Sequence, residues 1–98
     1  MNEAGQAVSE THYRFPPAAA YALNRCLYAL KSDDAFRARF LGDAKAAMAE
    51  HGLDADAQAA LLAADRDALV ARGAHPYLVF MANLRVRMAR GTGTFEYF

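Results

Sequence analysis

The sequence predicts an all-α protein, a small orthogonal bundle of about five helices. Apolar residues recur at the three- and four-residue spacings of helices, and Ala, the strongest helix former, makes up about a quarter of the chain. Strand-like alternation is confined to a short stretch at Phe95 and Tyr97. With 98 residues the chain forms one domain, and because Ala fills little volume, a few large side chains must supply the core.

The first helix is predicted over about residues 17–31. Proline is tolerated in the first turn of a helix, so Pro16-Pro17 marks its start. Leu23, Leu27 and Leu30 then repeat at i, i+4 and i+7, with Cys26 beside them. This spacing places them on one face, which we expect to be buried.

The second helix is predicted to begin after Ser32 or Asp33, either of which can cap its first turn. Phe36 and Phe40 follow at i, i+4 and should face the core. The pattern leaves open whether this helix breaks near Gly42-Asp43 or continues to residue 51.

The end of that segment has a clearer signal. Gly52 suits the left-handed position after a helix, and Leu53 suits the apolar contact that follows it in a Schellman motif. Two shorter helices come next, each with an aspartate as its expected N-cap and with Leu61 and Leu62 facing inward. They are residues 55–64 after Asp54 and residues 66–72 after Asp65, the latter closed by Gly73.

The fifth helix is predicted over about residues 76–89 and is expected to be the centre of the bundle. Its apolar stripe comprises Tyr77, Met81, Leu84 and Met88, broadened by Val79 and Phe80. The expected core residues of the whole chain are Leu27, Phe40, Leu61, Leu69, Met81 and Leu84. Truncation of Leu84 to Ala should therefore cost about 2–5 kcal/mol.

Charge and composition exclude several classes of protein. Eleven basic and eleven acidic side chains cancel, and no block of like charge exists, so we expect no nucleic-acid partner. No apolar run reaches the roughly 18 residues of a membrane span, and residues 1–10 lack the features of a signal peptide. Together with the single cysteine, Cys26, this predicts a cytoplasmic protein that has no membrane partner.

The residues that could carry chemistry are few. His12, His51 and His75 have no histidine or carboxylate at the spacing of paired metal ligands, so no metal site or cofactor is expected within this chain. Cys26 lies in an apolar stripe, where a thiol is normally buried and inert. Asp65 and Asp67, at i, i+2, point to different sides of a helix, and we expect no catalytic residue in the chain.

His75-Pro76 allows two interpretations. Proline at the first helical position favours an extended residue before it, so the histidine could simply stand at a helix start. An imidazole beside unpaired backbone N–H groups and aromatic side chains could also bind an anionic or aromatic group.

The chain is expected to divide into a flexible N-terminal segment (residues 1–15), a helical domain (16–90) and an aromatic tail (91–98). Residues 91–94 lack the lysine of a phosphate loop and are interpreted as a linker. The three aromatic residues of the tail predict either an arm that docks on another chain or a segment that folds back onto this domain.

An ordered set of residues between positions 21 and 88 resembles a known family. The set comprises Asn24, the Arg37/Phe40/Asp43 run, Gly52-Leu53, Gln58, Asp65, Leu69, Gly73 and His75-Pro76. It is similar to the small alpha (LigA-type) subunit of protocatechuate 4,5-dioxygenase and related class III extradiol dioxygenases. Each mark is weak alone, and the order and spacing carry the resemblance.

The resemblance implies a noncatalytic subunit for the catabolism of aromatic compounds. In that family a separate beta subunit holds Fe(II) with two histidines and a carboxylate, and the alpha subunit packs over the pocket as a lid. The residues then expected to contact the partner or its pocket are His75, Pro76, Tyr77, Phe80 and Asn24. The alternative is a stand-alone helical recognition or oligomerisation module that binds a peptide, a partner protein or a second copy of this chain.

Overall fold

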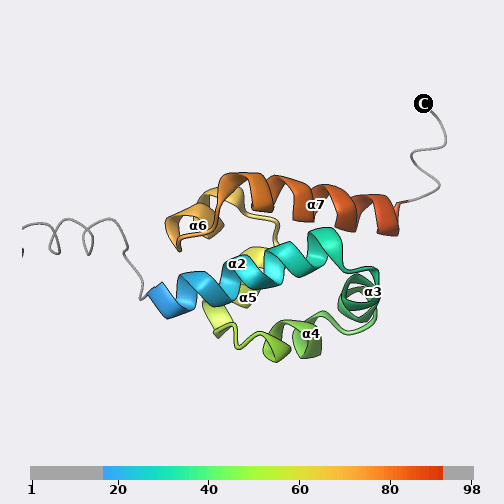
Figure 1. The fold of residues 1–98 in the computed structure, drawn as a ribbon, viewed down its shortest axis with the longest axis horizontal. Helices are drawn as coiled ribbons and strands as arrows, with labels where there is room; N and C mark the ends of the chain where they lie inside the picture. Colours follow the sequence, from blue (N-terminus) through green and yellow to red (C-terminus); the bar gives the residue numbers. More distant parts are fainter. Residues whose placement is uncertain (1–16, 92–98) are drawn as a thin grey trace, which may run out of the picture.

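The computed structural model describes residues 17–91, which form six helices and no strand. The helices are α2 (Pro17–Ser32), α3 (Asp34–Gly42), α4 (Ala44–Glu50), α5 (Ala55–Leu62), α6 (Arg66–Ala71) and α7 (Pro76–Arg90). The predicted all-α class is confirmed. In Figure 1, α2 crosses the middle of the view, with α7 along one side and α3 and α4 on the other. The expected segment 1–15 and residues 92–98 of the expected tail lie outside the described residues.

The core is built on the predicted face of α2. Leu23, Cys26, Leu27 and Leu30 are all at most 1% exposed, as their spacing indicated. This face packs against α7 and α3. The expected core residues Phe40, Leu61 and Leu69 are also buried, and Phe36, Ala47, Met48, Val79 and Ala82 join them.

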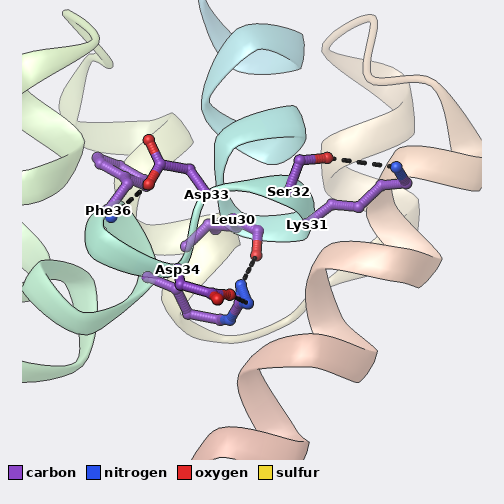
Figure 2. A network of polar contacts seen from close by, with 7 residues as sticks. Leu30, Lys31, Ser32, Asp33, Asp34 and Phe36 are labelled. Carbon is purple, nitrogen blue, oxygen red and sulfur yellow. Dashed lines mark hydrogen bonds and ion pairs between the residues drawn. The ribbon is translucent and has the colours of Figure 1, made fainter.

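The junction between α2 and α3 is closed by polar contacts (Figure 2). Of the two candidate caps it is Asp33 that acts, its carboxylate accepting a hydrogen bond from the backbone N–H of Phe36 at 3.1 Å. Arg37 is buried, and its guanidinium donates to the carbonyl of Leu30 at 3.2 Å and to the carboxylate of Asp34. Arg37 therefore satisfies a carbonyl at the end of α2, which has no partner within its own helix.

The helical segment is interrupted at Asp43, between α3 and α4. The sequence had left open whether one helix continues to residue 51, and the structure has two helices instead. Asp43 follows the last residue of α3, and its side chain accepts from the backbone N–H of Ala46 at 3.1 Å, capping α4. The predicted Schellman ending of α4 is confirmed. Gly52 has a φ of +75°, and the N–H of Leu53 donates back to the carbonyl of Met48 at 3.3 Å.

Both predicted aspartate caps are confirmed, Asp54 for α5 and Asp65 for α6. However, α5 ends at Leu62, earlier than expected, because Ala64 turns the chain with a left-handed φ of +54°. The N–H of Asp65 reaches the carbonyl of Ala60 at 3.0 Å, so this turn is a second Schellman ending, made without glycine. The expectation that Leu62 faces inward is wrong: it is 53% exposed, since only Leu61 of this pair points to the core.

Helix α7 begins and ends almost where predicted, but its buried face is different. The side chains against the core are Val79, Ala82 and Val86. Met81 and Leu84, expected in the core, are only half-buried, and Tyr77, Phe80 and Met88 are exposed. The physical reason is the close packing of α7 along α2, since helix axes approach more closely where the side chains between them are small. No described helix is long and apolar enough to span a membrane.

Candidate functional site

The start of α7 is positioned by the turn that follows α6. Gly73 has a φ of +99°, and the N–H of Ala74 donates to the carbonyl of Leu69 at 3.0 Å, a third Schellman ending. This turn lies directly against α2: a Cβ at position 73 would be 2.7 Å from the Cβ of Ala20. Glycine is therefore required here both for its backbone conformation and for the close approach.

Asn24 links α2 to this turn. Its side-chain amide donates to the carbonyl of Gly73 and to that of Ala20, both at 3.0 Å. Its side-chain oxygen accepts the backbone N–H of His75 at 2.8 Å. The structure thus brings together Asn24 and His75, two of the residues predicted to contact a partner, and shows that the amide of Asn24 is engaged within the chain.

His75 acts as the N-cap of α7. Its backbone is extended, and its Nδ1 accepts a hydrogen bond from the backbone N–H of Tyr77 at 3.1 Å, which requires an unprotonated Nδ1. The interpretation of His75-Pro76 as a helix start is therefore confirmed. His75, Pro76, Tyr77 and Phe80 are all exposed, and their role as partner contacts stays a prediction.

The outer face of α7 carries large apolar side chains. At about 100° per residue, these lie opposite the buried face of the helix. We call this set the α7 stripe: Tyr77, Phe80, Met81, Leu84 and Met88. Tyr77 is 55% exposed and Phe80 57%. The stripe that the sequence indicated does exist, but it faces outward.

A second surface feature is a groove of about 730 Å³ between α2, α3 and α4. Across it, the guanidinium of Arg39 donates to both carboxylate oxygens of Glu50, at 3.1 and 3.2 Å. The ring of His51 meets Phe36 edge-on at 4.9 Å. Burial and then the charge of Arg25 lower the pKa of His51 below its usual value.

The other candidate groups that the structure describes are Cys26 and Asp65, while His12 lies outside the described residues. Among residues 17–91 no three His, Cys, Asp or Glu side chains come together as a metal site, so these residues do not fit the iron centre of the resembled family. Burial, with a smaller contribution from Glu50, raises the pKa of the Cys26 thiol to about 12, and this favours the unreactive protonated form. The carboxylate of Asp65 is occupied in capping α6.

Gln58, another residue on which the family resemblance rests, also stabilises the packing of the helices. The side-chain amide of Gln58 donates to the carbonyl of Leu53 at 2.8 Å and so ties α5 to the preceding turn. One contact was missed by sequence reasoning: Arg72 binds both carboxylate oxygens of Asp54 at 2.7 and 2.8 Å. These residues are 18 positions apart, at the N-cap of α5 and the C-cap of α6, and no local spacing signals such a pair.

Comparison with known proteins agrees with the resemblance. A family model described as "Aromatic-ring-opening dioxygenase LigAB, LigA subunit" matches residues 23–95, which include most of α2 and all of α3 to α7. No curated protein and no solved structure matches the chain. Since the family model covers well over half of the sequence, the chain belongs to the LigA family, the small subunits of LigAB aromatic-ring-opening dioxygenases.

Proposed function

We propose that this chain is a noncatalytic subunit that packs over the iron site of a separate catalytic beta subunit. The match to the LigA family carries the proposal, because its description names one subunit of a two-part enzyme. Fe(II) held by the partner would supply the ring-opening chemistry, and this chain would contribute no ligand to it.

The roles of the family marks support a scaffold rather than a catalyst. Asn24, Arg37 and Gln58 each donate to backbone carbonyls of this chain, and each of these bonds closes a junction between helices. Side chains used in this way fix the shape of a surface. A subunit that shapes a neighbour's pocket needs such a rigid surface.

We place the pocket of the partner beside the first turn of α7. His75, Pro76, Tyr77 and Phe80 are exposed there, and they offer an imidazole and two aromatic rings on a rigid helix. Asn24 would act behind them, because two of its hydrogen bonds, to the carbonyl of Gly73 and from the N–H of His75, hold the turn that precedes α7.

The second candidate function is a stand-alone recognition or oligomerisation module. The exposed apolar side chains of α7 favour it, since exposed apolar side chains are also typical of surfaces that bind a peptide or a partner protein. The two functions differ in one respect that can be measured, namely whether a catalytic subunit associates with the chain.

The test is co-expression of the full tagged chain with the LigAB-type catalytic subunit encoded in the same genome. We expect the two to copurify, with iron and catechol ring opening in the complex. The isolated chain should bind neither Fe(II) nor Zn(II) tightly by calorimetry and should turn over no catechol. Stoichiometric metal binding by the isolated chain that is lost in His75→Ala would contradict the proposal, and so would failure of the two chains to associate.

A further inference from the structure

Helix α7 is apolar on two opposite faces, and the larger side chains lie on the outer one. The inner face consists of Val79, Ala82 and Val86, which pack into the core. The outer face is the α7 stripe, which runs over three turns from Tyr77 to Met88. A helix stabilised by its own domain alone needs only one apolar face. The outer face is therefore unexplained by the packing of residues 17–91, which the structure describes.

Exposure along the stripe is greatest at its aromatic members. Tyr77 and Phe80 each leave more than half of their surface in water. Aromatic side chains bury large areas when a partner covers them, and Tyr and Phe are enriched at protein interfaces. Tyr77, Phe80 and Met88 are exposed, and Met81 and Leu84 between them are half-buried. A stripe of this kind is typical of a docking surface, whereas single exposed apolar residues are common on any protein.

The charges beside the stripe indicate what covers it. Arg85 follows Met81 by four residues and Arg87 follows Leu84 by three, and these spacings place the arginines next to the stripe, one on each edge. Helix α7 carries a third arginine, Arg90, and no Asp or Glu.

A second copy of the chain fits this surface poorly. In a twofold dimer the same patch meets itself, so two α7 helices would bring their arginines together with no carboxylate from either helix to offset them. A partner of different sequence can instead place carboxylates along both edges. Complementary charge of this kind guides association and fixes the register of the contact.

We propose that the α7 stripe is the surface on which the catalytic subunit docks, and that this partner presents an apolar groove bordered by carboxylates. The inference rests on the proposed function for the existence of the partner. It adds the contact surface on this chain and the chemistry of the groove that receives it.

The test compares two pairs of substitutions in the full chain. Tyr77→Asp with Phe80→Asp alters the stripe. Tyr21→Asp with Tyr28→Asp is the matched control, because these aromatic residues of α2 are 63% and 57% exposed. Binding to the co-encoded catalytic subunit is measured by calorimetry, and circular dichroism melts verify that each variant is folded. Tyr77→Ala with Phe80→Ala replaces the first pair if the aspartates disturb the helix.

We expect the α7 pair to raise the Kd by about tenfold or more, as is typical for central aromatic contacts, and the α2 pair to leave it nearly unchanged. Arg85→Glu with Arg87→Glu should also weaken binding, whereas Arg25→Glu with Lys45→Glu should not. Equal binding by all variants would overturn the docking surface and leave the proposed function standing. If the unmodified chain does not bind the catalytic subunit, the proposed function itself fails, and this inference fails with it. If the chain alone forms a dimer, and the α7 pair of substitutions dissociates that dimer, the stripe is the contact between two copies of this chain and the inference is overturned.

Discussion

Replacement of Gly73 by Ala should destabilise the domain by about 2–5 kcal/mol. One part of this cost is the left-handed backbone, with a φ of +99°, which costs an ordinary residue roughly 1–2 kcal/mol. The other part is steric, because the new Cβ would be 2.7 Å from the Cβ of Ala20 and would force α2 and the turn apart at roughly 1–3 kcal/mol. Separation would also stretch the bond from Asn24 to the Gly73 carbonyl.

Gly52→Ala is the matched control for this substitution. Gly52 also has a positive φ, +75°, but a Cβ there would meet nothing within 4 Å, so only the backbone cost remains. Thermal melts should show Gly73→Ala losing roughly 10 °C or more and Gly52→Ala losing distinctly less. Adding Ala20→Gly to Gly73→Ala should recover part of the loss through a favourable coupling between the two sites. Equal losses in the two single variants, or the absence of coupling, would refute the argument that the close approach of α2 to this turn matters.

Three further predictions concern single positions. Ala64→Gly should stabilise the chain by roughly 0.5–1 kcal/mol in urea unfolding, because glycine adopts the φ of +54° without strain; a loss of stability would contradict this reading of the turn. Cys26, with its pKa raised to about 12, should resist a thiol reagent at about pH 8 in the folded protein and react once urea unfolds it; fast labelling of the folded form would count against its burial. The pKa of His51 is lowered in the folded protein, so as the pH falls the unfolded chain binds a proton at this histidine before the folded chain does. Stability should therefore fall as the pH drops below about 6.5. NMR titration of the folded protein should place the pKa of His51 below that of a free histidine.

The helix boundaries were largely predictable because they depend on local chemistry. Asp33, Asp54 and Asp65 each accept a backbone N–H three residues ahead, a bond that requires only a short side chain at the right position. The Gly52 ending was readable for the same reason. The turn at Ala64 was not, since the usual signal for a left-handed residue is glycine, and here an alanine adopts that conformation within the backbone hydrogen bonds of a Schellman ending.

The candidate site was predictable only in part. The resemblance selected Asn24 and His75 separately, but their hydrogen bond spans 51 positions and depends on how α2 and α7 pack. The pattern around Pro76 indicated a helix start, and the structure assigns that function to the His75 ring as well. No property of the local sequence distinguishes an asparagine that holds a turn from one that faces a partner.

The orientation of α7 illustrates a limit of reasoning from periodicity. Residues at helical spacing form two apolar stripes on this helix, one of small side chains and one of large, and hydrophobicity favours burial of the larger ones. The domain buries the smaller stripe, Val79, Ala82 and Val86, where α7 packs along α2, and small side chains between two helices allow their axes to approach closely. Burial of the smaller stripe is unfavourable for residues 17–91 by themselves, since Tyr77 and Phe80 then remain in water. It becomes favourable when a second protein covers the larger stripe. The property that misled the sequence prediction, a helix with more apolar surface than its own core can bury, is the property expected of a subunit.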